Sequence, residues 1–219
     1  SNAVDLSYSS SSSSTRGATG NYSTAMGRST TASGNYSTAM GISTTTSGNS
    51  STAMGDSSAA SGYAATAMGV YTQASGYAST AMGNSSTANG FTSTAMGRNT
   101  TASGDYSTAM GYGTTASGIV STALGFLTTA SDYASTVIGQ YNSSGSSVTN
   151  SASLFSTSNT AFVIGNGTDS SNKSDAFKVM FNGDTTVSND LTVSGDVVIS
   201  SDARLKSNIV SLGSTLPKL

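Results

Sequence analysis

Residues 21–34 read NYSTAMG followed by RSTTASG, and variants of these two heptads alternate along more than half of the chain. From Gly20 to Gly139 every seventh residue is glycine, with Asp132 as the exception. Because the two heptads differ, the true period is 14 residues. A fixed period of this kind indicates a repeat architecture in which each unit packs on the next.

Three columns of residues run through the first heptad. A large apolar residue precedes each of its glycines, at Met26, Met40, Met54, Met68, Met82, Met96, Met110, Leu124 and Ile138. Threonine stands two positions before each of these residues, and alanine stands between the two, with Val137 in the last unit. Alternation along a strand places the Met and Thr columns on one face and the Ala column on the other. We expect the Met column to form the core.

A β-solenoid accounts for the period better than a helix does. A coiled coil needs apolar a and d positions with charged flanks, whereas a glycine in each heptad weakens a helix by about 1 kcal/mol. Collagen needs glycine at every third residue. We therefore predict two short strands and two turns in each unit, with glycine supplying positive φ at the turns. Nine units at about 4.8 Å each give a rod of about 40 Å.

The interior of such a coil is thin. Its small residues allow a single chain to bury little apolar surface. The shortage of large apolar side chains favours burial against partner chains, and a homotrimer about a common axis would supply that burial.

Composition excludes several classes of function. The eight Lys and Arg residues are scattered and the net charge is −2, so we expect no nucleic-acid partner. The chain has no cysteine, histidine or glutamate, and hence no disulfide framework and no obvious metal, cofactor or acid–base site. We therefore expect no cofactor and no catalysis on an external substrate. The longest apolar runs, 161–164 and 197–199, are too short to span a bilayer.

The second half of the chain loses the repeat. Residues 141–158 are polar and are expected to be a connector. Alternating apolar residues bounded by Asn-Gly dipeptides follow, and the dipeptide at 182–183 predicts a hairpin between 177–181 and 185–187. The same β pattern continues over 191–200. We expect 141–200 to be a β-rich shaft or a second head.

The repeats resemble the head of YadA-type trimeric adhesins. The segments STAMG, STALG and STVIG stand where that family has SVAIG, and TTASG stands for its second half. The resemblance implies a left-handed parallel β-roll over residues 17–140, assembled as a homotrimer. Thr replaces the usual Val of the family, and its hydroxyl needs a hydrogen bond if it is buried.

Residues 201–209, SDARLKSNI, resemble the start of the chaperone-of-endosialidase family, whose members are intramolecular chaperones that cut themselves from trimeric fibres. The resemblance implies that Ser201 is the nucleophile, that the bond before it is cut, and that Lys206 is the base. Lysine can serve as a base where burial lowers its pKa. Residues 201–219 would then be a truncated stub, inactive at this length. Residues 1–16 are expected to be a tag remnant and a Ser-rich lead-in, which places the natural start elsewhere.

Aromatic residues after the turn glycines are the candidate binding residues. Tyr22, Tyr36, Tyr106 and Tyr112 are the first choice, and Tyr63, Tyr77, Phe91 and Tyr133 occupy similar places. Exposed aromatics suit sugar stacking and protein contacts. The alternative is that they pack across subunits or shield coil edges.

These observations predict an extracellular fibre, on a cell surface or a virion, that attaches to a cell-surface glycan or protein receptor. Three copies would act with avidity. One alternative is a structural spacer whose receptor tip lies elsewhere, and another is a fibre whose main activity is its own cleavage before Ser201. A third alternative is ice binding by the Thr column, which parity disfavours because it places Thr beside Met.

Overall fold

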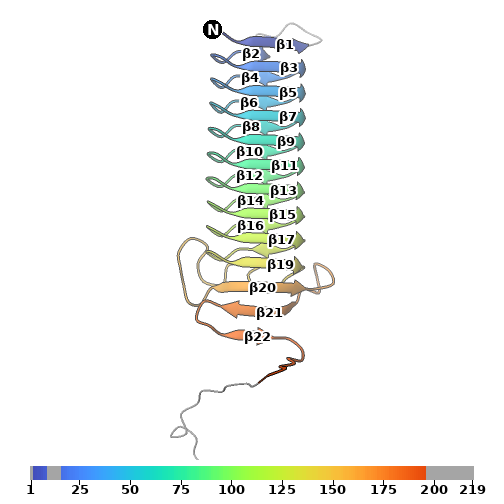
Figure 1. The fold of residues 1–219 in the computed structure, drawn as a ribbon, viewed down its shortest axis with the longest axis vertical. Coiled ribbons are helices and arrows are strands. Elements are labelled where there is room, and N and C mark those ends of the chain that lie inside the picture. The colour runs from blue at the N-terminus through green and yellow to red at the C-terminus, as the bar shows by residue number, and fades with distance from the viewer. Residues whose placement is uncertain (1, 9–15, 196–219) are drawn as a thin grey trace, which may run out of the picture. The chain divides into compact units, whose positions relative to one another are not determined.

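A computed structural model describes residues 2–8 and 16–195 and divides the chain into two compact units between Asn189 and Asp190. The first unit is an all-β parallel solenoid (Figure 1). The described part of the second unit, residues 190–195, contains no strand. Within the residues that the structure describes, no helix is long and apolar enough to cross a membrane.

Each coil of the solenoid contains one long and one short strand. The long strands are β3 (Thr24–Arg28), β5 (Thr38–Ile42), β7 (Thr52–Asp56), β9 (Thr66–Val70), β11 (Thr80–Asn84), β13 (Thr94–Arg98), β15 (Thr108–Tyr112), β17 (Thr122–Phe126) and β19 (Thr136–Gln140). The short strands are β2 (Gly17–Ala18), β4 (Thr31–Ala32), β6 (Thr45–Thr46), β8 (Ala59–Ala60), β10 (Gln73–Ala74), β12 (Thr87–Ala88), β14 (Thr101–Ala102), β16 (Thr115–Ala116) and β18 (Thr129–Ala130). This arrangement confirms the predicted solenoid of two-strand units.

The two kinds of strand build two parallel layers. The short strands form a 9-stranded sheet from β2 to β18. The long strands form a 13-stranded sheet that begins with β1 (Val4–Tyr8) and continues past β19 into β20 (Thr160–Asn166), β21 (Asp175–Met180) and β22 (Thr185–Val187). Equivalent residues stack in register, so that Met82 pairs with Met68 on one side and with Met96 on the other.

Alanine fills the space between the two layers. The Ala column of the long strands, from Ala25 to Ala123, is fully buried, and so are Ala32 and its alanine equivalents on the short strands after it. Ala18, on the first short strand, is partly buried. The Met column lies on the outer face of the long sheet, where Met26 is 38% exposed and Met110 37% exposed. The expectation that Met forms the core is therefore wrong for the single chain. Parity separates the Met face from the Ala face, and the narrow space between the layers admits only the smaller residue. The Thr24 column shares the outer face and is half-buried.

The two glycines of a repeat are needed for different reasons. Gly62 has no positive φ, but a methyl group on it would lie 1.9 Å from the carbonyl oxygen of Gly76 in the next coil. Gly27, inside β3, combines a φ of 113° with a similar clash. At the corners, the left-handed φ belongs to residues such as Tyr22 and Ser29, both at 56°. The expectation that glycine supplies the positive φ of the turns is therefore wrong at the corners, except at Gly113, which has a φ of 62°.

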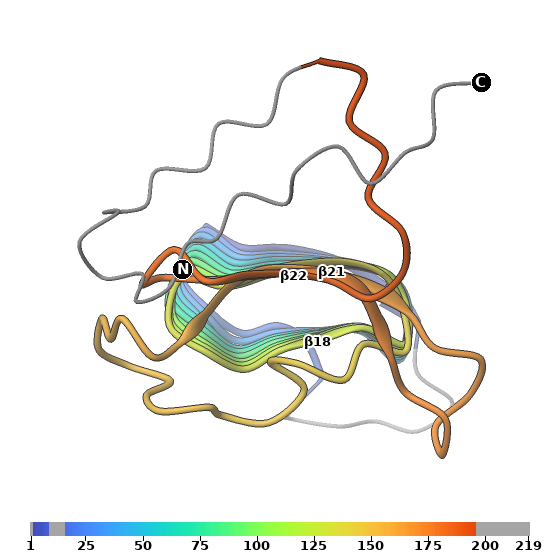
Figure 2. The same cartoon turned by 90° about the horizontal axis from the view of Figure 1, so that it is seen from below.

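The strands after the coils extend the long sheet. β20 pairs in parallel with β19, and β21 and β22 then add in antiparallel fashion. The turn at Gly183 joins β21 to β22, which confirms the predicted hairpin. No strand forms over 191–195, contrary to the predicted β pattern, and residues 196–200 lie outside the described residues. Figure 2 shows β21 and β22 over the layer of long strands, with β18 in the other layer.

Candidate binding surfaces

The exposed aromatic residues gather at two different corners of the coil. Tyr22, Tyr36 and Tyr106 lie in the turn that precedes a long strand, whereas Tyr112 is the last residue of the long strand β15. The structure therefore does not bring the four predicted binding residues into one site. Their exposed fractions run from 38% for Tyr112 to 64% for Tyr36, so all four reach the surface.

The first corner carries a ladder of stacked rings. The ring centroids of Tyr63 and Tyr77 lie 5.0 Å apart, and those of Tyr77 and Phe91 lie 4.9 Å apart, with interplanar angles of 11° and 6°. Tyr106 meets Phe91 edge-on at 5.5 Å. A separate pair, Tyr22 and Tyr36, stacks at 5.3 Å. Successive coils repeat at nearly the distance that aromatic rings prefer, so one ring per coil forms a stack.

Stacking limits what these rings can bind. Both faces of Tyr77 are covered by its neighbours Tyr63 and Phe91. A sugar that stacks on an aromatic ring needs an open face, which is free only at the ends of a ladder. The interior rings, Tyr77 and Phe91, offer their edges to the solvent, and Tyr77 also offers a hydroxyl group, which suits contacts with a protein or with sugar hydroxyls.

The second corner carries its own ladder. Tyr112 stacks on Phe126 at 5.1 Å, and Phe126 meets Tyr141 edge-on at 5.4 Å. The guanidinium carbon of Arg98 lies 5.5 Å from the ring centroid of Tyr112. Arg98 sits one coil before Tyr112, so a cation–π contact occupies the position where another aromatic ring would stack.

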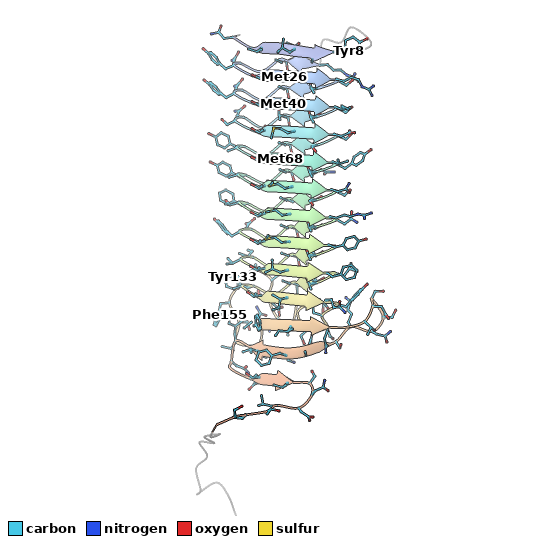
Figure 3. The ribbon with its side chains drawn as sticks, turned by 45° about the vertical axis from the view of Figure 1, so that its right-hand side comes forward. Tyr8, Met26, Met40, Met68, Tyr133 and Phe155 are labelled. Atoms are coloured by element: carbon cyan, nitrogen blue, oxygen red, sulfur yellow. The ribbon has the colours of Figure 1, made fainter. Side chains whose placement is uncertain are left out.

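An apolar column runs along the outer face of the long sheet. It begins at Leu6, which pairs with Met26, and it continues through the Met column to Ile138, Ile164, Phe177 and Val187. Figure 3 shows Met26, Met40 and Met68 one above another on this sheet. We call this set the outer apolar column. Most of its side chains are half-buried, and Leu6, Met26, Met110 and Val187 are exposed. A continuous apolar strip on an open face is typical of a protein–protein interface.

Asp132 ends the regular coils. It takes the place of the repeat glycine and is fully buried, and its carboxylate accepts the backbone N–H groups of Thr149 at 2.6 Å and Thr160 at 2.8 Å. A side chain fits here because no regular coil follows at this corner. The break in the glycine pattern is visible in the sequence. The residues that bind the Asp132 carboxylate could not be predicted, because they lie in the segment that has no repeat.

Two more polar side chains, Asn142 and Asp175, bind backbone groups near the last coil. Together with Asp132 they form what we call the C-terminal cap. The Asn142 side-chain oxygen accepts the N–H of Thr129 at 2.8 Å, and its amide nitrogen donates to the Thr129 carbonyl at 2.9 Å. The amide thus closes the free edge of β18. The Asp175 carboxylate accepts the N–H groups of Ser143 and Ser144, each at 2.8 Å. Sequence reasoning missed both residues because neither belongs to the repeat.

A polar cavity of about 430 Å³ opens beside this cap. Its lining comes from the connector after β19, from β20 to β22 and from the segments that join and follow them. The lining residues are Ser143, Asn166, Lys173, Ser174, Asp175, Lys178, Thr186, Ser188 and Asn189.

The predicted cleavage residues Ser201 and Lys206 lie outside the described residues. In residues 2–8 and 16–195, no group of three or more His, Cys, Asp or Glu side chains could hold a metal ion.

The coils define this chain as a repeat-built parallel β-solenoid. The family model described as the YadA head domain repeat (2 copies) matches residues 18–44, 32–58, 47–72, 60–86, 74–90, 88–114 and 116–142. Because these matches cover more than half of the 219 residues, the chain belongs to the YadA head domain family. A comparison with curated proteins found no match to the chain.

Proposed function

We propose that this chain is the head of a homotrimeric, extracellular adhesin fibre, wound as a left-handed β-roll, which attaches to a cell-surface glycan or protein. The outer apolar column is the observation that carries the proposal. It places a large apolar side chain in nearly every coil on a face that the single chain leaves open. Membership of the YadA head family supports the same assembly.

Three long sheets packed around a common axis would cover this column. Identical rungs would then meet at the same height, because every chain has the same coil spacing. Burial of apolar surface contributes about 25 cal/mol per Å², so that covering about 40 Å² of each Met stabilises the trimer by about 1 kcal/mol per rung. Nine or more rungs in each chain make the gain large enough to offset the entropy of association.

The corner ladders are the proposed adhesive surfaces. They project from the coil with their edges exposed, and a trimer would present three copies of each ladder. Three weak contacts with one target surface bind far more tightly than one, because the second and third are intramolecular. The proposed location is a cell surface or a virion.

The solution mass of the purified chain tests the assembly. Light scattering should give the mass of three chains. Met82→Asp should lower the trimer fraction, because it places a charge in the outer apolar column, whereas Asn84→Asp adds the same charge to an exposed position of the same strand and should not. A wild-type chain that is a folded monomer at micromolar concentration would overturn the proposal.

One observation favours a second candidate, a structural spacer. Stacking covers the faces of the interior rings, as expected if the ladders only brace the coil edges. A cell-binding assay or a glycan array with Tyr106→Ala and Tyr112→Ala separates the two functions. Loss of binding with an unchanged trimer mass supports the adhesin, and unchanged binding to the same target supports the spacer.

A further inference from the structure

The cavity at the C-terminal cap is lined by a lysine that stands at an inward position of the long sheet. The inward-facing column of the long sheet holds alanine from Ala25 to Ala123, followed by Val137 and Val163, all fully buried. Val163 pairs with Lys178, which in turn pairs with Thr186. Directly paired residues lie on the same face of a sheet. From Ala25 to Val163 the inward column is therefore small and apolar, and its two last members are the polar residues Lys178 and Thr186.

The layers of the solenoid end at different heights. The short-strand sheet stops at β18, whereas the long-strand sheet continues through β20, β21 and β22. Figure 2 shows the last strands over one layer only. The inward face of β21 and β22 is consequently left without an opposing sheet, and Lys178 and Thr186 line the cavity there.

The charge of the lining is positive. Lys173 and Lys178 both line the cavity, and Asp175 is the one acidic residue among the lining residues. The Asp175 carboxylate is already engaged by the N–H groups of Ser143 and Ser144. Two lysines therefore line a space whose single carboxylate already accepts hydrogen bonds from the local backbone.

The remaining lining residues are neutral and rich in hydrogen-bonding groups, namely Ser143, Asn166, Ser174, Thr186, Ser188 and Asn189. Several of them are held in place. Ser174 donates from its hydroxyl to the Asn166 side-chain oxygen at 2.7 Å, and the Ser188 hydroxyl donates to the carbonyl of Asp175. The cavity volume of about 430 Å³ lies in the range typical of small-molecule sites.

We propose that this cavity binds an acidic saccharide, with Lys178 and Lys173 on its anionic group and the Ser, Thr and Asn side chains on its hydroxyls. Ammonium groups form strong charge-assisted hydrogen bonds with carboxylate and phosphate oxygens. Hydroxyl and amide groups match a polyhydroxylated ligand, and the lining contains no aromatic ring that would favour an apolar one. This inference rests on the proposed function, because it assigns the chemical class of glycan to the adhesive head.

Isothermal titration calorimetry of the full chain with D-glucuronate, D-glucose and D-glucose 6-phosphate tests the site. We expect glucuronate to bind at least about ten-fold more tightly than glucose, and the binding to weaken with added salt. Preference for glucose 6-phosphate over glucuronate would also support the anionic subsite and would assign a phosphate as its natural ligand group. Equal binding of glucose and glucuronate, or no binding of either anion, would overturn the proposal.

Variants locate the site and separate it from the adhesive function. Lys173→Gln combined with Lys178→Gln should weaken glucuronate at least about ten-fold, and Lys178→Arg should retain most of the affinity. Arg28→Gln removes one positive charge from an exposed coil corner, as each single Lys→Gln change does in the cavity, and should change nothing. If Lys178→Gln fails to fold, Lys173→Gln and Lys178→Arg still decide the question. Unchanged glucuronate binding in every folded variant would contradict the proposed site. A chain that binds glucuronate but never adheres to cells would contradict the adhesin function and still support the site.

Discussion

The backbone N–H of Thr160 donates to the carboxylate of Asp132 across 2.8 Å, although the two residues lie 28 positions apart in the chain. Asp132 belongs to the last coil, and Thr160 is the first residue of β20. A single buried carboxylate thus fixes where the non-repeating strand joins the solenoid.

Asp132→Ala should lower the free energy of unfolding by about 2–4 kcal/mol, because it leaves the buried N–H of Thr160 and the part-buried N–H of Thr149 without their charged acceptor. Thermal unfolding followed by circular dichroism measures the change, and limited proteolysis should show faster cutting in residues 143–159. Asp190→Ala removes the same charge from an exposed position and serves as the control. Equal melting temperatures for the two variants would contradict the role given to Asp132.

Gly62→Ala should destabilise the solenoid by about 3 kcal/mol or more, because the added methyl group would lie 1.9 Å from a backbone oxygen of the next coil. The matched change Gly195→Ala meets no atom within 4 Å and should have little effect. Denaturant titration of both variants gives the difference. A Gly62→Ala protein as stable as the parent would mean that neighbouring coils can separate at low cost.

Ala78→Gly should raise the free energy of unfolding by up to about 1 kcal/mol, since Ala78 has a φ of 49°, a region that glycine enters without strain. Ala81→Gly makes the same substitution three residues later and is the matched control. Ala81 is a fully buried strand residue, so its replacement should cost about 1 kcal/mol or more. Opposite signs for the two variants in the same denaturant series are the expected result, and two equal losses would argue against strain at the corner.

The pKa of Asp169 is held below its ordinary value of 3.8, first by the side-chain amide of Asn172 and then by the backbone N–H of Ser171. A lowered pKa in the folded state means that the contact stabilises the loop above the ordinary value and is lost as the pH falls through the folded pKa. A two-dimensional NMR titration should therefore show the Ser171 and Asn172 amides shifting below pH 3.8. Asn172→Ala should move that midpoint upward, and a midpoint that stays in place would show that the amide is not its cause.

In a polypeptide that carries the whole chaperone domain after residue 200, the SDARLK motif predicts a cut before Ser201. Denaturing gel electrophoresis should show two fragments for the parent and one intact chain for Ser201→Ala. Lys206→Met should also block cleavage, because the serine would lose its proposed base. Cleavage of the Ser201→Ala chain at the same bond would remove the assigned role of Ser201.

The repeat made the coils predictable, because a period of 14 with one Met and one Ala column fixes the strands, their register and their two faces. Which face points inward was not predictable from the alternation of side chains along the strand, because alternation only separates the Met face from the Ala face. The distance between the layers decides it, and that distance leaves room for Ala25 and its equivalents but not for methionine. The Asn-Gly dipeptide at 182–183 specified its hairpin locally, and that prediction is confirmed.

The candidate sites were less predictable than the fold. Tyr106 and Tyr112 stand six residues apart, which is close in sequence, yet a long strand separates them and puts them at opposite ends of it. The cap and the cavity depend on pairs such as Asp132 with Thr160 and Val163 with Lys178. Such contacts join the repeats to a segment that has no repeat, so the periodicity of the sequence could not predict them.

The in-register stacking of equivalent residues has a consequence for how such heads evolve. Since each coil contacts only the coil before it and the coil after it, an in-frame duplication or deletion of one whole repeat leaves every remaining contact type intact. Slippage during DNA replication can therefore alter the reach of the head without a folding defect. Natural variants of this gene should differ in length by whole repeats, while the terminal cap around Asp132 keeps its sequence.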